Sequence, residues 1–255
     1  MNVVQGIDAL VVDDGPAFVV VGVFDGLHLG HRYLLERLVG ESGRRGAKPV
    51  VITFDHHPDE VLMGLAPPLL LDPQERLERL ADAGIEVTVV QHFDAALRET
   101  PYDVFIERIR SRLVLTGFLM TPDAAFGFER RGTPEVVGDL GARDGFDVVV
   151  VPPLMLDGRP VRSTDIRDAI AVGDLDAARE LLGRQLTLTG AIDPDGHLHF
   201  AMPMAMPPDG RYPVDLLGVV RTLEIRDGVA YVPGQPLTER AVIGFVPSRS
   251  GAVRA

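Results

Sequence analysis

Two histidines, His28 and His31, lie on either side of a Leu-Gly pair in the segment 28–31. In the first turn of a helix, this three-residue spacing places both imidazoles on one face. Both rings can then donate hydrogen bonds to the oxygens of a transferring phosphorus, where negative charge accumulates. Gly30 has no Cβ atom, so a nucleotide can approach the backbone closely. The segment predicts a site for the phosphates of a nucleoside triphosphate, the alternative being two solvated or core histidines at a turn.

The elements around this segment support a phosphate site. Residues 17–24 (AFVVVGVF) have the composition of a buried strand, which runs into a glycine-containing turn from Gly22 onward. Residues 30–38 then carry leucines at helical spacing. A strand that ends in such a turn and enters a helix is the usual anion site of doubly wound domains, because unpaired N–H groups there face the ligand.

Similar strands and helices alternate over the first two thirds of the chain. Asp72 and Glu75 flank Pro73 in the pattern of a helix start, and residues 100–103 repeat this pattern. The further strands are predicted at 49–54, 86–91, 113–120 and 146–151, and the further helices at 165–171 and 174–182. Near-continuous apolar strands alternating with helices predict an α/β fold, a Rossmann-like doubly wound parallel sheet with its ligand at the carboxyl ends of the strands.

The pattern changes after Gly183. Short alternating runs (LTLTGAI, VVRTLEI, VAYV, AVIGFV) are separated by Asp-Gly and Pro-Gly turns, which predicts a small antiparallel β domain. The expected domains are therefore 1–183 and 184–255. The methionines of the Met/Pro segment 202–208 either fill the core or cover a ligand. The residues from about Pro247 onward are expected to form a loose tail.

Composition excludes several classes of protein. The net charge of -12 argues against non-specific binding to nucleic acid or anionic membranes. The chain has no cysteine, which rules out disulfides and thiol nucleophiles and disfavours a zinc site at the two histidines. No apolar run approaches the ~18 residues of a membrane span, and the first residues do not resemble a signal peptide. We expect a cytoplasmic protein with small-molecule partners, and composition leaves its oligomeric state open.

Residues 22–31 (GVFDGLHLGH) resemble the signature of the HxGH nucleotidylyltransferase superfamily. The fuller pattern is similar to the adenylyltransferase module of bacterial bifunctional FAD synthetases, which carry riboflavin kinase and FMN adenylyltransferase activities. Residues 53–58 (TFDHHP) resemble the family's TF-x-PHP element, and residues 123–132 resemble its D-F-R-F-G-x-x-x-x-G loop. Residues 162–167 (RSTDIR) resemble its S-S-T-x-I-R element. The resemblance covers roughly residues 15–190.

The resemblance implies a nucleotidyltransferase that makes FAD and pyrophosphate from ATP and FMN, with Mg²⁺ held through the phosphates and no direct side-chain ligand. Asp25 would organise the loop or hold Mg²⁺ through water. The catalytic residues would be His28, His31 and Arg167, with Arg167 as a bidentate phosphate clamp. The nucleotide would be bound by Gly22, Val23, Phe24, Asp25, Gly30, Ser163 and Thr164. The acceptor would be bordered by Phe54, His57, Pro58, Asp123, Phe126, Gly127 and Arg162.

Several of these positions have a purely structural alternative. Ser163 and Thr164 would serve as an ordinary N-cap if they preceded a helix. Arg167 would be a solvated arginine on a helix surface, and His57 with Pro58 an ordinary turn.

The chain departs from the family pattern at the acceptor loop and at the kinase. Ala124 and Ala125 replace aromatic and basic residues after Asp123, and Arg162 replaces the family's first serine. Gly183 to Ile192 resembles the start of the kinase barrel, but the segment 200–206 (FAMPMAM) stands where the kinase carries its P-T-A-N element. We therefore expect no riboflavin kinase activity. The alternatives are a paralogue with another phosphorylated acceptor or another nucleotide donor, and a flavin- or nucleotide-binding regulatory protein.

Overall fold

The computed structural model describes residues 1–11 and 15–247, and it divides into two compact units. The first unit contains Met1–Phe24, Gly30–Pro67 and Leu77–Met155. The second contains Asp25–Leu29, Pro68–Arg76 and the chain from Leu156 onward. Two short early segments thus group with the late part of the chain. The division into domains 1–183 and 184–255 stays a prediction.

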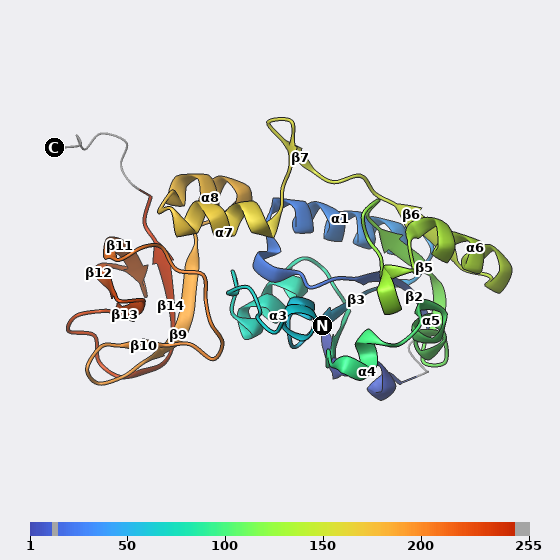
Figure 1. Cartoon of the computed structure of the whole chain (residues 1–255), viewed down its shortest axis with the longest axis horizontal. Helices are drawn as coiled ribbons and strands as arrows, with labels where there is room; N and C mark the ends of the chain where they lie inside the picture. Colours follow the sequence, from blue (N-terminus) through green and yellow to red (C-terminus); the bar gives the residue numbers. More distant parts are fainter. Residues whose placement is uncertain (12–14, 248–255) are drawn as a thin grey trace. The chain divides into compact units, whose positions relative to one another are not determined.

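A six-stranded parallel sheet forms the centre of the first unit (Figure 1). Its strands are β1 (Asn2–Gln5), β2 (Pro16–Val21), β3 (Lys48–Phe54), β4 (Val87–Gln91), β5 (Val114–Met120) and β6 (Asp147–Val150), in the order β1-β4-β3-β2-β5-β6. The chain winds outward from β2 through β3 and β4, then returns to β5 on the other side of β2. In a doubly wound sheet, ligands bind outside the carboxyl ends of the strands at this switch point.

The strands are buried on both faces, as the doubly wound prediction requires. Ala17 and Val19 of β2 lie in the same apolar core as Phe105 and Ile109 of α5 (Tyr102–Arg110). The alternate residue Phe18 points to the opposite face and is also fully buried. Figure 1 shows α1 (Leu29–Arg44) along one side of the strands and α5 along the other.

Local sequence accounts for some of the helix starts in the first two thirds of the chain. Asp72 Oδ1 accepts hydrogen bonds from the amides of Gln74 and Glu75 at 3.0 and 3.1 Å, which begins α3 (Pro73–Asp82) as predicted. The predicted cap at Thr100 is wrong, because α5 has Pro101 at its N-cap and Thr100 donates backward to the Ala96 carbonyl. The other helices described in the first unit are η1 (Ile7–Ala9), α2 (Pro58–Met63), α4 (Ala95–Arg98), η3 (Phe128–Arg130) and α6 (Pro134–Asp144).

The second unit contains the predicted antiparallel sheet. Its strands are β9 (Thr187–Ile192), β10 (Leu198–His199), β11 (Gly210–Leu216), β12 (Val219–Arg226), β13 (Val229–Tyr231) and β14 (Thr238–Phe245), in the order β10-β9-β14-β11-β12-β13. Asp227 and Gly228 both have positive φ, as a tight turn between β12 and β13 requires. The unit also contains η2 (Asp25–Leu27), α7 (Ser163–Ala171) and α8 (Leu175–Leu182), while β7 (Met155–Leu156) pairs with β8 (Arg159–Pro160).

The Met/Pro segment fills the core of the second unit. Met204 is 7% exposed and belongs to the apolar cluster of the antiparallel sheet. The Leu69 amide donates to the Pro203 carbonyl at 2.8 Å, and the Ala205 amide donates to the Leu69 carbonyl at 2.8 Å. The methionines of this segment were expected either to fill the core or to cover a ligand, and Met204 fills the core.

Two further expectations concern the chain as a whole. The loose tail predicted from about Pro247 lies, beyond that residue, outside the described residues. Within residues 1–11 and 15–247, no helix has both the length and the apolar character needed to cross a bilayer.

Candidate active site

The turn that follows β2 is held in an unusual backbone conformation. Phe24, Gly26 and Leu27 have φ values of 53°, 80° and 38°, a region that non-glycine residues adopt only when their surroundings enforce it. A Cβ atom on Gly26 would lie 3.0 Å from the Leu70 side chain, so this position is both strained and crowded for any other residue. The conformation of this turn therefore depends on the residues packed against it, such as Leu70.

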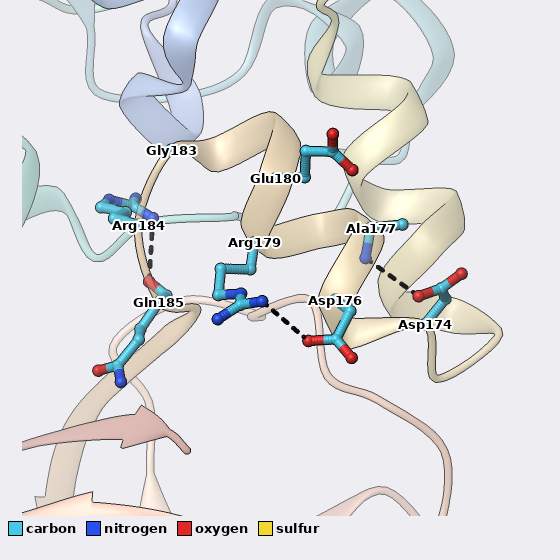
Figure 2. A pocket seen from close by; sticks show the side chains of 8 residues that line it. All are labelled: Asp174, Asp176, Ala177, Arg179, Glu180, Gly183, Arg184 and Gln185. Atoms are coloured by element: carbon cyan, nitrogen blue, oxygen red, sulfur yellow. Dashed lines mark hydrogen bonds and ion pairs between the residues drawn. The ribbon is translucent and has the colours of Figure 1, made fainter. Parts of the chain in front are cut away.

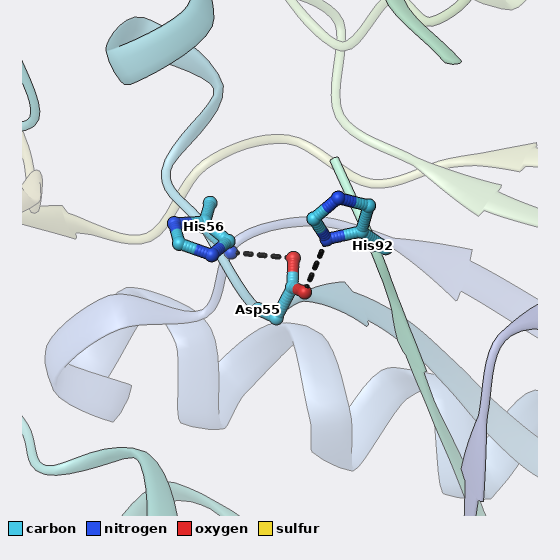
Figure 3. Close-up of side chains that lie close together, drawn as sticks. All are labelled: Asp55, His56 and His92. Carbon is cyan, nitrogen blue, oxygen red and sulfur yellow. Dashed lines mark hydrogen bonds and ion pairs between the residues drawn. The ribbon is translucent and has the colours of Figure 1, made fainter. Parts of the chain in front are cut away.

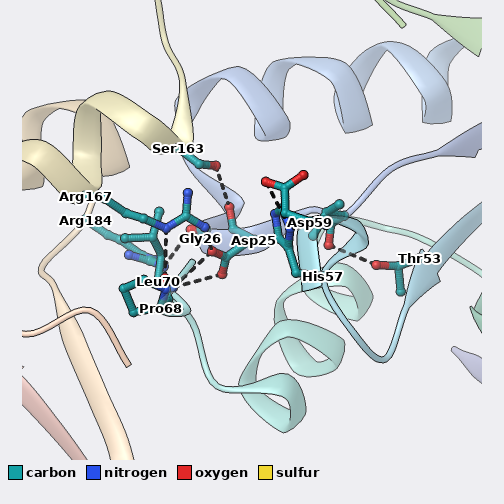
Figure 4. A network of polar contacts seen from close by, with 11 residues as sticks. Asp25, Gly26, Thr53, His57, Asp59, Pro68, Leu70, Ser163, Arg167 and Arg184 are labelled. Carbon is teal, nitrogen blue, oxygen red and sulfur yellow. Dashed lines mark hydrogen bonds and ion pairs between the residues drawn. The ribbon is translucent and has the colours of Figure 1, made fainter. Parts of the chain in front are cut away.

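Asp25 is the centre of a buried polar network in the second unit (Figure 4). Its side chain is 4% exposed, and its two carboxylate oxygens accept from the Leu70 amide at 3.0 and 3.1 Å. Oδ2 also accepts from Arg167 Nη2 at 2.5 Å, while Arg167 Nε donates to the Pro68 carbonyl at 2.8 Å. Asp25 thus ties the turn to α7 and to the segment 68–70.

Arg162, Ser163 and Thr164 lie at the start of α7. The N-cap is Arg162, which makes no side-chain capping bond, and Ser163 is the first helical residue. The predicted alternative of an ordinary Ser-Thr cap is therefore wrong. Ser163 Oγ instead donates to the Asp25 carbonyl at 3.2 Å, and Arg162 and Thr164 are exposed. α7 has nine residues, and the backbone N–H groups of its first turn, which have no acceptor within the helix, lie next to these side chains.

His28 is a buried imidazole next to two arginines. Burial, followed by the positive charges of Arg184 and Arg167, lowers the pKa of His28 from 6.5 to about 4. At neutral pH the ring is uncharged, so one nitrogen carries a proton and can donate a hydrogen bond. Arg184, which sequence reasoning did not assign to the site, donates through Nη2 to the Gly26 carbonyl at 2.7 Å.

We predict that His28 makes the protein acid-sensitive. Its pKa is lower in the folded than in the unfolded chain, so the unfolded chain binds a proton first as the pH falls from about 6.5 to about 4. The contribution of the neutral His28 ring to the free energy of unfolding is present in full well above pH 6.5 and is lost across this interval. At pH 5 the free energy of unfolding should be lower by about 2 kcal/mol. Urea unfolding at pH 7.5 and pH 5, compared with His28→Asn, measures this contribution. An equal pH-dependence in both proteins would contradict the prediction.

The first unit holds the other predicted nucleotide-side residues. His31 is the third residue of α1, and its ring centroid lies 5.2 Å from that of Phe24. A Cβ atom on Gly22 would lie 3.0 Å from the Phe24 ring, so glycine leaves room for that ring. The Val23 carbonyl accepts from Thr53 Oγ1 at 2.9 Å, and Gly30 is the second residue of α1.

The predicted acceptor residues after β3 have structural partners. Phe54 packs edge-on against Phe93 with ring centroids 5.2 Å apart. His57 is the N-cap of α2, where its Nδ1 accepts from the Asp59 amide at 3.2 Å, and Pro58 is the first residue of that helix. His57 and Pro58 thus begin a helix, and their role at the acceptor stays a prediction.

The loop after β5 is anchored by Phe126 and Gly127. The Phe126 ring centroid lies 5.6 Å from those of Phe105 and Phe118, and the partly buried ring packs against the core of the first unit. Asp123 is exposed and accepts from Thr121 Oγ1 at 2.8 Å. The loop therefore presents Asp123 at the surface while Phe126 holds its far end.

Gly127 has a conformation and a position that exclude a side chain. Its φ is +76°, and a Cβ atom there would collide with the backbone of Tyr102. We predict that Gly127→Ala lowers the free energy of unfolding by about 2–3 kcal/mol. Gly145→Ala, where φ is +84° but no atom lies within 4 Å, is the matched control and should cost about 1 kcal/mol. Equal costs in urea unfolding would contradict a steric role for Gly127.

A pocket beside α8 contains none of the predicted site residues (Figure 2). Its lining includes three acidic side chains, Asp174, Asp176 and Glu180, and two arginines, Arg179 and Arg184, the second of which also contacts the turn at Gly26. Arg179 already pairs with Asp176 at 3.3 Å. This acidic lining does not suit a triphosphate, so we place the candidate site at the Asp25 network.

The structure thus gathers Asp25, His28, Ser163 and Arg167 in the second unit, together with Arg184. His31 and the predicted acceptor residues other than Arg162 lie in the first unit. The parallel sheet with its switch point beside β2, together with a separate antiparallel sheet, defines a doubly wound α/β protein with an added small β unit. The chain belongs to the FAD synthetase family, whose model matches residues 11–165.

Curated relatives agree with this family. The bifunctional riboflavin kinase/FMN adenylyltransferase of Haemophilus influenzae is 33% identical over 174 residues, which are 68% of this chain and 56% of the relative. The protein of the same name from Escherichia coli is 30% identical over 178 residues, again 68% of this chain and 56% of the relative. The chain thus matches less than two thirds of the length of these relatives.

One solved structure has the same fold over nearly the whole chain. The structure titled "Macrolide-efflux Protein from Streptococcus pneumoniae" superposes with a TM-score of 0.80 at 22% identity, covering 96% of this chain and 88% of that one. At this identity the likeness establishes the fold alone. The predicted fold class, including the antiparallel C-terminal sheet, is confirmed.

Proposed function

We propose that this protein is an ATP:FMN adenylyltransferase that makes FAD and pyrophosphate. The observation that carries the proposal is the neutral His28 beside Arg167 and Arg184, in the signature turn of a FAD synthetase family member. The phosphate of FMN would attack the α-phosphorus of ATP in line. A new phosphoanhydride bond forms as the bond to the β-phosphate breaks, and pyrophosphate leaves without a covalent enzyme intermediate.

In this proposal the residues act by positioning and by stabilising charge. His28 and His31 would donate N–H bonds to the α-phosphate oxygens and the leaving group, where negative charge grows during transfer. The arginines beside His28 would attract the triphosphate. Arg167 is already bound to Asp25 and to the Pro68 carbonyl, so we assign it a positioning role as well as a phosphate contact. Residues 1–183 would carry this activity together with Arg184.

Magnesium would enter with the phosphates. Asp25 does not fit a role as its ligand, because its carboxylate already accepts hydrogen bonds from Leu70 and Arg167 and its charge is balanced. Among the described residues, the two groupings of histidine and carboxylate close enough to hold a metal include none of Asp25, His28 and His31. Mg²⁺ would instead be held through the phosphate oxygens and would neutralise their charge.

The direct test is incubation of the protein with ATP, Mg²⁺ and FMN, followed by detection of FAD and pyrophosphate. FAD formation that is lost in His31→Ala and retained in His199→Ala supports the proposal. His199 is a suitable control because its side chain is 64% exposed on the antiparallel sheet. Tight ligand binding without pyrophosphate would overturn the enzyme assignment in favour of a regulatory protein.

A different phosphorylated acceptor is the second candidate. Two observations favour it: Ala124 and Ala125 replace larger residues in the loop that starts at Asp123, and the exposed Arg162 stands at the start of α7. Pyrophosphate release with other phosphorylated acceptors, but not with FMN, would select this candidate.

We also predict no riboflavin kinase activity. The segment where the kinase carries its nucleotide element is instead a core segment, with Met204 buried and the backbone of 203–205 bonded to Leu69. Riboflavin incubated with ATP and Mg²⁺ should give no FMN above a protein-free blank. Enzyme-dependent FMN formation would refute this.

A further inference from the structure

Three side chains gather at the carboxyl edge of the parallel sheet, on the neighbouring strands β3 and β4 (Figure 3). Asp55 and His56 directly follow β3, and His92 directly follows β4. Phe54 and Gln91 are register partners, so the residues after them emerge side by side. One ligand atom from each of the three side chains lies within 4.8 Å of the others.

The Asp55 carboxylate is oriented by the backbone around it. Its Oδ1 accepts from the amides of His56 and Phe93 at 2.7 and 3.1 Å, and its Oδ2 lies 2.6 Å from His92 Nδ1. Burial raises the pKa of Asp55, but the hydrogen bonds from His92, Phe93 and His56 outweigh it and leave the pKa below its usual value. The amides thus fix one carboxylate oxygen, and the other, Oδ2, faces the His92 ring.

His56 is oriented by a second carboxylate. Its Nδ1 lies 3.0 Å from Glu60 Oε2 in α2, and its ring is edge-on to that of His92 with centroids 5.7 Å apart. Histidines that bind metals in proteins generally have a carboxylate or carbonyl at the other ring nitrogen, which sets the ring orientation. Glu60 is placed to do this for His56.

We propose that Asp55, His56 and His92 form a binding site for a divalent transition metal such as Zn²⁺, Co²⁺ or Ni²⁺. Two imidazoles and one carboxylate are the ligands that these ions prefer, whereas Mg²⁺ prefers oxygen ligands alone. With metal–ligand bonds of about 2.0–2.2 Å, tetrahedral ligands lie roughly 3.4 Å apart. The two histidine side chains are 42% and 61% exposed, so they can shift or turn to reach this spacing, and for His92 metal ligation would replace its 2.6 Å contact with Asp55 Oδ2. Three protein ligands leave a fourth position for water or an incoming group.

This site is distinct from the phosphate-bound magnesium of the proposed reaction. A metal bound here would join the segment after β3, which leads into α2, to the segment after β4. Its occupancy can be measured without ATP or FMN, so its test does not depend on the proposed function.

A second histidine cluster must be removed before the test. His199 Nε2 and His197 Nδ1 lie 2.8 and 3.5 Å from Asp193 Oδ2, near the turn between β9 and β10. We therefore use tag-free protein in which both histidines of this cluster are replaced, His197→Ala/His199→Ala, as the parent for metal titrations.

The experiment titrates this parent with Zn²⁺ by calorimetry and with Co²⁺ by visible absorption. We expect one equivalent to bind, about 10-fold or more weaker binding in His92→Gln and in His56→Ala, and no displacement by excess Mg²⁺. Glutamine at position 92 keeps an N–H donor for Asp55, and the thermal midpoint of the metal-free variant shows whether it is folded. Absence of saturable binding up to about 1 mM metal, or undiminished binding in folded His92→Gln, would overturn the proposal.

Discussion

Asp25→Ala is expected to lower the free energy of unfolding by about 3 kcal/mol and to abolish FAD formation. The Asp25 and Arg167 side chains are 4% and 15% exposed, so the substitution leaves a mostly buried guanidinium without its counter-charge. It also removes the acceptor of the buried Leu70 amide. Urea unfolding followed by circular dichroism measures the loss of stability, and the FAD assay measures the loss of activity.

The control for this prediction is an exposed carboxylate nearby. Asp165 lies in the first turn of α7 and is exposed, so Asp165→Ala should change stability by about 0.5 kcal/mol or less. The double variant Asp25→Asn/Arg167→Met removes both charges and should recover part of the lost stability. If Asp25→Ala costs no more than Asp165→Ala, the network does not hold the turn.

His28→Ala is expected to reduce kcat for FAD formation by about 10²–10³-fold, with a smaller change in KM for ATP. The reason is that a neutral imidazole is proposed to donate a hydrogen bond that strengthens as charge develops on the phosphate oxygens. His28→Asn keeps an N–H donor and should retain more activity than the alanine variant. Steady-state kinetics with saturating FMN test this.

Folding must be checked for both His28 variants, because the side chain is buried. His199→Ala serves again as the control with an exposed histidine. A folded His28→Ala enzyme with kcat within about threefold of the parent would remove His28 from the catalytic machinery.

Local patterns were sufficient for most of the fold. The apolar runs at 17–24 and 49–54 correspond to β2 and β3, and the Asp-Pro pair at 72–73 begins α3. These signals succeed because a strand in a doubly covered sheet must be apolar throughout, and because an N-cap depends on residues within one helical turn. The short edge strand β1 was not predicted. Only one of its four residues is even partly shielded from solvent, so it lacks the apolar pattern of a buried strand.

The candidate site was only partly predictable. His28, His31 and the Ser-Thr-x-Ile-Arg element were identified from spacing and resemblance, whereas Arg184 was noted only as part of the barrel start. The Asp55–His92 pair was also missed, because its members lie 37 residues apart in the chain. No local pattern links residues that meet only when parallel strands align.

The sequence alone determined which side chains were available: two histidines three residues apart, an aspartate in the turn before them, and no cysteine. The tertiary structure decided which groups these side chains meet. Asp25 binds partners 45 and 142 residues away, at Leu70 and Arg167. The neutral state of His28 likewise results from burial and from Arg184, 156 positions later in the chain by the difference of the two residue numbers. Desolvation and long-range charge depend on packing in three dimensions, which local sequence does not specify.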